Sequence, residues 1–391
     1  MAVFIITITI FLIYLLAESY YHSKLLGRIH LRISVSGTRG KTSIVRMLAS
    51  VCRSNGMRVL AKTTGSEARY ILPDGSEEKI KRRGVISIIE QKNLVKKAAQ
   101  LGVDCIITEI MSINPENHFA ETHKLIRPHL TILSNLRADH LDVVEESQKE
   151  ITALHINDIY PGSNLFIPSG EINNILRVGI EKSGAKLNPV EKDAATKMGV
   201  NPDVPGSMFR NNIDLVSSVA ASLSISVDTI HRGLRAAIMD IGDSAVYLLE
   251  NKVKKVYFVN SFAANDPLSA MELVDKTLGS ISNTEAPVYG FLSLRADRGE
   301  RSRQWLDFLS HGAENRFRHL FISGLHAGIL RKKIKESSII RSNDPATIMG
   351  SIISEVEDGS VVFGLANIHG RGMQMVNYCR ENGIKIALHG I

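Results

Sequence analysis

A lysine and two hydroxyl residues follow a glycine-rich turn near the start of the chain. The turn, GTRGKTS, comes directly after the apolar run LRISVS, which is typical of a strand. Glycines let backbone N–H groups face phosphate oxygens, and a helix beginning there offers its positive end. Lys41 can reach the β- and γ-phosphates of a nucleotide, and the Thr42 hydroxyl can ligate Mg²⁺. Although Val35 replaces the first glycine of the strict motif, we predict a phosphate loop of Gly37, Thr38, Arg39, Gly40, Lys41, Thr42 and Ser43.

Carboxylate and imidazole side chains are expected at the ends of two neighbouring strands. Glu109 closes the apolar run CIITE, where an ionised side chain in the core would be costly. It therefore belongs at the carboxyl edge of the sheet, where such sheets bind ligands and where Mg²⁺ needs an oxygen ligand. The next strand runs into NLRADHLD, which supplies Asn135, Asp139, His140 and Asp142. A single histidine is usually a satisfied surface residue, but its place in this cluster favours a site.

Apolar runs alternate with helical stretches over the first part of the chain, which predicts a parallel α/β sheet. The expected strands are 31–37, 57–65, 103–112 and 130–136, and the expected helices are 42–55 and 88–102, with Gly102 as C-cap. A second α/β block has expected strands at 246–250, 256–262, 287–294, 319–324 and 360–367. We predict a central domain at 31–243 and a C-terminal domain at 244–391.

The first 17 residues, MAVFIITITIFLIYLLA, carry no charge. A helix of this length just spans the hydrocarbon of a bilayer. Basic residues Lys24, Arg28 and Arg32 follow it, no charged segment precedes it, and no clear cleavage site is present. We expect a single-pass membrane anchor at 1–21 with the catalytic domains in the cytoplasm; a cleaved or buried apolar strand is the alternative.

The bulk composition excludes some function classes. The net charge is +7 and aromatic residues make up 6%, and the basic clusters at 79–84 and 331–335 contain no aromatic residue. A nucleic-acid surface would need both kinds of residue on one face, so we expect solvated basic faces and no nucleic-acid partner. The three cysteines are far apart and form no CxxC pair, which suits a reducing compartment and argues against a zinc site.

The phosphate loop, the strand-end Glu in TEIMS and the NLRADHLD segment together resemble the Mur ligase superfamily. The segments AKTTGSEARYILPDG, VNSFAANDPLSA, LRADRGERSRQW and GLANIHGRG are similar to the ligase-subunit family of poly-γ-glutamate (capsule) synthases over essentially the whole chain. The resemblance implies an anchored Mur-ligase-like P-loop ATPase domain followed by a Rossmann-like α/β domain. It also implies an ATP-dependent ligase that polymerises glutamate through an acyl phosphate.

The resemblance implies roles for particular residues. The loop residues would hold ATP phosphates, with Lys41, Glu109 and His140 as catalytic residues, and Thr42, Glu109 and His140 as Mg²⁺ ligands. Asn135 would contact the adenine side, and the C-terminal domain would add Asn260, Asn265, Asp266, Arg295, Asp297 and Arg298 to the nucleotide site. The acidic substrate would be held by Lys62, Thr64 and Arg69, together with Asn367 and His369. The partners implied are glutamate, a poly-γ-glutamate acceptor, the membrane, an integral-membrane synthase or export subunit, and further copies of the chain.

Two departures from the superfamily pattern stand out. Mur ligases carry a metal-bridging carbamylated lysine some fifteen residues after the Asp-His pair, but the corresponding ITALHINDIYPG has no lysine. His155 or Asp158 could substitute, or the second metal is held differently. The arginine near the domain boundary is also missing. Two alternatives remain: another Mur-type or folylpolyglutamate-type ligase, and a membrane-bound P-loop ATPase that scaffolds polymer export.

Overall fold

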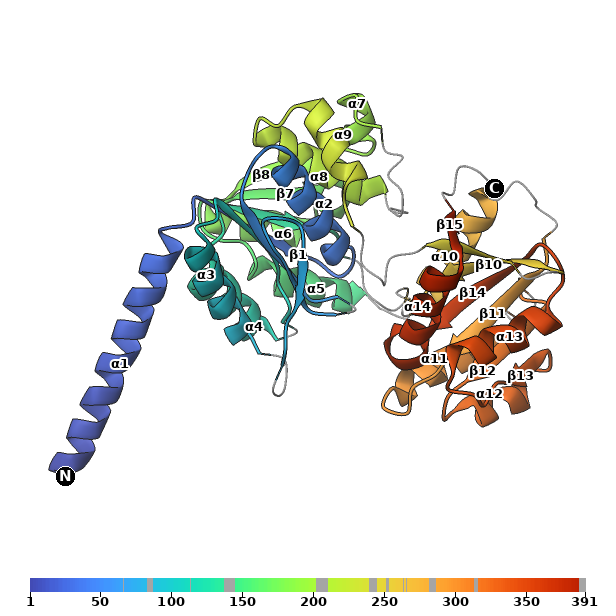
Figure 1. Ribbon diagram of the computed structural model, residues 1–391. Helices are drawn as coiled ribbons and strands as arrows, with labels where there is room; N and C mark the ends of the chain where they lie inside the picture. The colour runs from blue at the N-terminus through green and yellow to red at the C-terminus, as the bar shows by residue number, and fades with distance from the viewer. Residues whose placement is uncertain are drawn as a thin grey trace. The chain divides into compact units, whose positions relative to one another are not determined.

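The chain forms two compact units, each a sheet with helices packed against it (Figure 1). This computed structural model describes residues 1–65, 67–82, 87–112, 114–136, 145–201, 210–238, 245–250, 253–262, 264, 266–280, 286–312 and 316–386. The described parts of the two units are therefore 1–238 and 245–386.

Helix α1 (Ala2–Leu26) leads into the first unit and is long and apolar enough, by length and composition, to cross a membrane. Only His22, Leu25 and Leu26, near its end, are buried. The Thr7 and Thr9 hydroxyls donate to backbone carbonyls four residues earlier, at 2.9 and 2.8 Å, so they need no external partner in an apolar surrounding. The helix continues five residues beyond the predicted anchor at 1–21.

The sheet of the first unit has eight strands in the order β4-β3-β2-β5-β1-β6-β7-β8. The strands are β1 (Leu31–Ser36), β2 (Val59–Thr63), β3 (Arg69–Ile71), β4 (Glu77–Lys79), β5 (Cys105–Glu109), β6 (Leu130–Leu133), β7 (Asn164–Pro168) and β8 (Lys186–Val190). Neighbouring strands in the part of this order that runs β2-β5-β1-β6-β7-β8 pair in parallel, as the alternating pattern predicted. The antiparallel edge strands β3 and β4 were not predicted, because they are short and partly charged.

The helical elements of the first unit are α2 (Lys41–Ser54), α3 (Ile89–Leu101), α4 (Pro115–Phe119), the π-helix η1 (Ala120–Ile126), α5 (Glu145–Ile156), the 3-10 turn η2 (Ser169–Glu171), α6 (Asn174–Ser183), α7 (Ala194–Lys197), α8 (Arg210–Ser222) and α9 (Val227–Arg235). The helix α2, which follows the phosphate loop, is held closely by α9. A Cβ on Gly233 would lie 2.4 Å from the Val51 Cα, so the two helices approach as only a glycine allows.

The second unit has a seven-stranded sheet in the order β13-β12-β11-β14-β10-β9-β15. Its strands are β9 (Val246–Glu250), β10 (Lys255–Asn260), β11 (Val288–Ser293), β12 (His319–Ser323), β13 (Ser337–Ile339), β14 (Ser360–Ala366) and β15 (Ile384–Ile386). Its helical elements are α10 (Pro267–Ser280), α11 (Gly299–Ser310), α12 (Ala327–Lys333), α13 (Pro345–Glu355), the π-helix η4 (Ile368–Gly372) and α14 (Met373–Asn382).

Both faces of this second sheet are buried. Neighbouring residues of one strand, such as Leu292 and Phe291, belong to different apolar clusters on opposite faces. Coverage of both faces is the rule for parallel sheets. The strands from β13 to β10 are parallel, whereas β9 and β15 pair antiparallel at one edge. The carboxyl ends of the parallel strands therefore meet at one edge of the sheet.

Candidate active site

The phosphate loop fits between β6 and α8 only because two of its residues are glycines. Gly37 has φ of +112°, and a Cβ there would lie 2.3 Å from the Ser134 Oγ. Gly40 has φ of +81°, and its Cβ would lie 2.8 Å from the Asn212 side chain. Both conformations are strained for any residue with a side chain. The loop is thus fixed closely against the end of β6 and the start of α8.

The loop opens directly into the N-terminus of α2. Gly40 is the N-cap and has no side chain to satisfy the first N–H groups, and the first turn contains no acidic residue. These groups and the helix dipole attract an anion. The Lys41 ammonium donates to the carbonyls of Gly37 (2.5 Å) and Thr38 (3.2 Å), so it lies across the loop. Thr42 and Ser43 lie in this first turn, and a phosphate bound there would meet a lysine and two hydroxyls.

Asn135, which follows β6, holds the loop in place. Its backbone carbonyl accepts from the Thr38 N–H (3.2 Å), its side-chain oxygen accepts from the Thr38 hydroxyl, and its Nδ2 donates to the Arg39 carbonyl (3.0 Å). The structure therefore places Asn135 against the loop itself, with its side-chain amide engaged by loop atoms.

Glu109 lies beside the loop with one carboxylate oxygen unsatisfied. Strand pairing sets it opposite Val35, two residues before Gly37, and it is 1% exposed. Its Oε2 accepts from the Thr64 hydroxyl (2.5 Å), while Oε1 has no hydrogen-bond partner in the described part of the chain. A buried carboxylate oxygen without a partner is unfavourable, so this atom is a candidate to bind a ligand. A divalent cation that prefers oxygen ligands fits this position, and the Thr42 hydroxyl in the first turn of α2 is a second candidate ligand.

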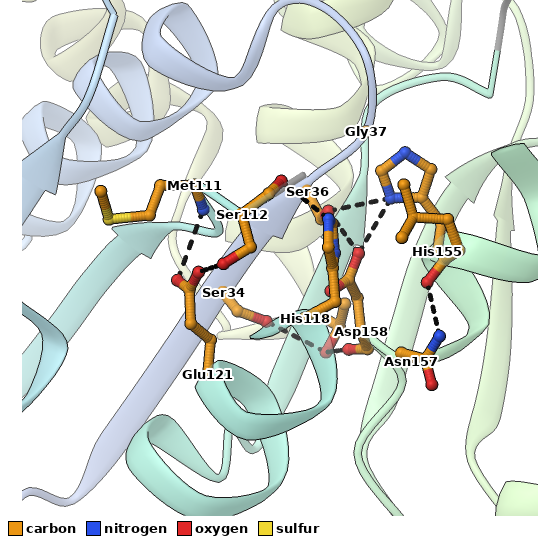
Figure 2. A network of polar contacts seen from close by, with 12 residues as sticks. Ser34, Ser36, Gly37, Met111, Ser112, His118, Glu121, His155, Asn157 and Asp158 are labelled. Carbon is orange, nitrogen blue, oxygen red and sulfur yellow. Dashed lines mark hydrogen bonds and ion pairs between the residues drawn. The ribbon is translucent and has the colours of Figure 1, made fainter. Parts of the chain in front are cut away.

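A second polar cluster lies under the loop and centres on Asp158, which is fully buried (Figure 2). Its Oδ1 lies 2.7 Å from His118 Nδ1, and its Oδ2 lies 2.9 Å from His155 Nδ1 and 2.5 Å from the Ser36 hydroxyl. His118 Nε2 lies 2.8 Å from the Ser112 carbonyl. The cluster thus joins the end of β1 to three separate segments.

The charges of this cluster support one another. Burial alone would raise the pKa of Asp158, but the hydrogen bonds from His118 and His155 outweigh it and lower that pKa. Burial likewise opposes a charge on His118, but its hydrogen bond and charge interaction with Asp158 raise the pKa of His118 above its usual value. Both shifts favour the charged forms of these two side chains, which lie 2.7 Å apart in the buried site.

The sequence did not reveal most of this cluster. His155 and Asp158 were considered only as substitutes for a missing lysine, and His118, Ser36 and Glu121 were not considered at all. Glu121 is fully buried, and it accepts from the Gln91 amide (2.7 Å) and from the Ser112 hydroxyl. No local motif marks these residues, because their contacts join segments far apart in the chain.

The predicted acidic-substrate residues lie in different environments. Lys62 is fully buried; its ammonium lies 3.2 Å from a Glu90 oxygen, and burial lowers its pKa while Glu90 opposes the shift. Arg69 is half-buried and pairs with Glu67 (2.6 Å). Only Thr64 reaches the Glu109 carboxylate. Lys62 therefore has a structural environment in the sheet, without an open face toward a substrate.

Two members of the basic cluster at 79–84, for which we expect a solvated face, are each paired with a glutamate. Lys79 lies 2.6 Å from Glu67, and Arg82 lies 2.7 Å from Glu90. Arg83 lies outside the described residues, as do His140, Asp139 and Asp142 of the predicted metal cluster.

The second unit holds a cavity of about 520 Å³ at the carboxyl ends of its strands. It is lined by Ile339, the last residue of β13, and by residues that follow β11, β12, β13 and β14: Leu294, Arg295, Ala296, Asp297, Gly324, Leu325, Ile340, Arg341, His369, Gly370 and Arg371. The cavity brings together the two predicted segments LRADR and NIHG. Arg295 is held by Asp297 through contacts of 2.9 and 2.6 Å.

The remaining predicted residues of this unit lie around the cavity or apart from it. Asn367 is buried and does not line it; its Nδ2 donates to the Ser293 carbonyl (3.0 Å) and its Oδ1 accepts from Arg301 (2.7 Å). Arg298 is the exposed N-cap of α11. Asn260 ends β10 and is buried, and Asp266, just before α10, is 8% exposed. Asn265 lies outside the described residues.

Comparison with known proteins matches both units. Residues 35–155 match the Mur ligase middle domain, and residues 246–382 match the poly-gamma-glutamate synthase CapB C-terminal domain. PGA synthase CapB of Bacillus subtilis (strain 168) is 25% identical over 97% of this chain and 98% of its own length. Capsule biosynthesis protein CapB of Bacillus anthracis is 29% identical over 78% of this chain and 66% of its own.

Solved structures show the same fold. The bifunctional folylpolyglutamate synthase/dihydrofolate synthase of Yersinia pestis, complexed with AMPPNP and Mn ion, has a TM-score of 0.69 at 14% identity, covering 92% of both chains. The folylpolyglutamate synthase of Thermotoga maritima has a TM-score of 0.61 at 15% identity, covering 94% of this chain and 96% of that one.

Proposed function

The chain belongs to the CapB family of poly-γ-glutamate synthases within the Mur ligase superfamily, and we propose that it joins glutamate into poly-γ-glutamate with ATP. The observation that carries this proposal is the uncapped helix N-terminus with Lys41, set beside the buried, half-satisfied Glu109 carboxylate. A divalent cation, which we propose to be Mg²⁺, would be held by Thr42 and Glu109 and would neutralise phosphate charge when bound.

In the first step, an oxygen of the acceptor's terminal γ-carboxylate attacks the γ-phosphorus of ATP, and ADP leaves. The new bond is the P–O bond of an acyl phosphate. The Lys41 ammonium and the N–H groups of the first turn of α2 stabilise the charge on the transferring phosphoryl group. Asn135 contributes by holding the loop, through three hydrogen bonds, in the shape that presents these donors.

In the second step, the neutral amine of the next glutamate attacks the acyl carbon, phosphate leaves, and the proton lost by the amine passes to the departing phosphate. An amide bond forms, and the chain grows by one residue. Water must be excluded, because it would hydrolyse the acyl phosphate. We propose that the arginine-lined cavity of the second unit receives a substrate carboxylate, since Arg binds carboxylates in a bidentate manner.

We also propose that α1 anchors the enzyme in the membrane with both units in the cytoplasm. The length and apolar composition of α1 and the basic residues that follow it support this topology. An anchored enzyme would pass its polymer to an integral-membrane export partner.

The test is ADP release by the full-length chain in detergent, with and without glutamate and a short γ-glutamyl acceptor. Turnover should require both substrates, and Lys41→Ala and Glu109→Ala should each lower it by about 100-fold or more. Lys186→Ala and Glu181→Ala are the matched controls, since both side chains are exposed, and they should behave as wild type. ATP hydrolysis that ignores glutamate and acceptor would instead favour an ATPase that scaffolds export.

A further inference from the structure

The hydrogen bonds around Asp158 fix where the protons of two histidines lie. An ionised carboxylate only accepts. His118 Nδ1 and His155 Nδ1 both lie within hydrogen-bond distance of Asp158 (2.7 and 2.9 Å), so both nitrogens carry protons. The Ser36 hydroxyl, 2.5 Å from the same carboxylate, donates its proton there as well. Asp158 is therefore fully engaged by donors.

The two histidines differ at their second ring nitrogen, Nε2. His118 Nε2 lies 2.8 Å from the Ser112 carbonyl, which only accepts, so His118 carries protons on both nitrogens and is positively charged. This charge balances Asp158. His155 has no such acceptor at Nε2 in the described part of the chain. Of the four ring nitrogens, His155 Nε2 is therefore the one that these hydrogen bonds leave for another ligand.

The three side chains His118, His155 and Asp158 do not themselves enclose a metal ion. Their ligand atoms lie within 4.8 Å of one another, but the nitrogens that face Asp158 hold protons. The open ligand atom is His155 Nε2, which lies on the edge of the ring away from Asp158 (Figure 2). The cluster therefore orients the His155 imidazole.

That imidazole lies next to the phosphate loop. Its Nδ1 is 3.1 Å from the hydroxyl of Ser36, the last residue of β1 before Gly37. The residue is 4% exposed, so the ring is held almost entirely inside the first unit. Glu109, opposite Val35 in the strand pairing, brings its own unpaired oxygen to the same end of β1.

We propose that His155 Nε2 is a direct ligand of a divalent cation at the phosphate loop, and that Asp158 is the residue that positions it. Metal-binding histidines typically donate their other ring N–H to a carboxylate, which is the arrangement here. His155 lies in the segment where the resemblance implies a carbamylated lysine, and this segment contains no lysine. Carbamylation of a lysine consumes carbon dioxide, whereas an imidazole ligand needs none. The inference rests on the proposed nucleotide site.

The experiment measures Mn²⁺ binding to the full-length chain with AMPPNP, without glutamate or acceptor. EPR titration gives the Mn²⁺ affinity, and electron spin-echo modulation detects imidazole nitrogen bound to the ion. We expect His155→Gln to weaken Mn²⁺ binding tenfold or more and to reduce the nitrogen modulation. Asp158→Asn should weaken binding by about 10- to 100-fold while the modulation persists, because the imidazole remains but is less well oriented. The exposed His129 supplies the control, and His129→Gln should match wild type.

His140 is expected to supply another imidazole, so the His140→Asn variant isolates the contribution of His155. Nitrogen modulation should survive in His140→Asn, which also decides the question if His155→Gln fails to fold. Removal of bicarbonate should leave Mn²⁺ affinity unchanged. The proposal is overturned if His155→Gln keeps wild-type affinity and modulation, if His140→Asn loses all modulation, or if binding requires bicarbonate. Because no turnover is measured, these outcomes are independent of whether glutamate is the substrate.

Discussion

The two units place polar residues at the same structural position, the carboxyl edge of an α/β sheet, but in different states. In the first unit, Glu109, Asp158 and His155 are at most 4% exposed and are held by bonds from several elements. In the second unit, Arg295 and Asp297 are 30% and 60% exposed and line an open cavity. A buried network suits groups that must be oriented for phosphate and metal chemistry. An open cavity with arginines suits a substrate that enters and leaves at each addition.

The largest expected effect tests whether the first network is structural as well as functional. Asp158→Ala leaves the His118 imidazolium without its partner in a buried site, and we expect a loss of about 3 kcal/mol in the free energy of unfolding of the first unit. The only tryptophan, Trp305, is fully buried in the second unit, so its fluorescence reports that unit. Circular dichroism during denaturation should therefore show an earlier first transition, with an unchanged fluorescence transition.

Asp297→Ala provides the matched change in the second unit. Its contact with Arg295 is solvent-exposed, and such pairs contribute little to stability. Neither transition should move measurably. If Asp158→Ala is equally silent, the buried ion pair does not stabilise the first unit and the contrast between the units fails.

A smaller effect, on AMPPNP binding, is expected from adding a side chain to the phosphate loop. Gly37→Ala places a Cβ 2.3 Å from the Ser134 Oγ in a conformation that strains any side chain, and we expect about 1–3 kcal/mol of lost AMPPNP binding. Isothermal titration measures this. Gly162→Ala is the control, since Gly162 also has positive φ (+70°) but nothing lies within 4 Å of its Cβ. Equal losses in both variants would show that general destabilisation, and not a change in the phosphate loop, is responsible.

The loop was predictable because its elements adjoin in sequence: an apolar strand, two glycines, a lysine and a helix. Glu109 was predictable from an acidic residue at the end of an apolar run. The Asp158 cluster was not, because its bonds join residues 40 and 122 positions apart, as between His118 and Asp158 and between Ser36 and Asp158. Strands β3 and β4 were missed for a different reason: they are three residues each, and β4 reads Glu-Glu-Lys, which no apolar pattern marks.

The cavity of the second unit should affect substrate affinity and leave nucleotide binding unchanged. Arg371 lines it, one of its nitrogens donates to Asn343, and its buried Nε has no hydrogen-bond partner in the described residues. We expect Arg371→Ala to raise the KM for glutamate or for the acceptor roughly tenfold, about 1.4 kcal/mol, without changing AMPPNP affinity. Arg303→Ala, at an 85% exposed position on α11, is the control. A weaker AMPPNP affinity in Arg371→Ala would instead place the cavity in the nucleotide site.

The smallest effect on stability is expected for the basic cluster at 79–84 on the first unit. Lys79 is 63% exposed and paired with Glu67, so Lys79→Ala should change stability by less than about 0.5 kcal/mol. If the cluster is a solvated face, the variant also keeps the wild-type product length and salt dependence of chain growth, measured by gel analysis of the polymer. Lys255→Ala is the control, because Lys255 is 64% exposed and also pairs with a glutamate, Glu250. Shorter product and a weaker salt dependence in Lys79→Ala alone would show that the first unit guides the polyanion at its surface. The first unit would then carry an exposed polyanion-binding surface in addition to its buried phosphate site, and substrate binding would not be confined to the open cavity of the second unit.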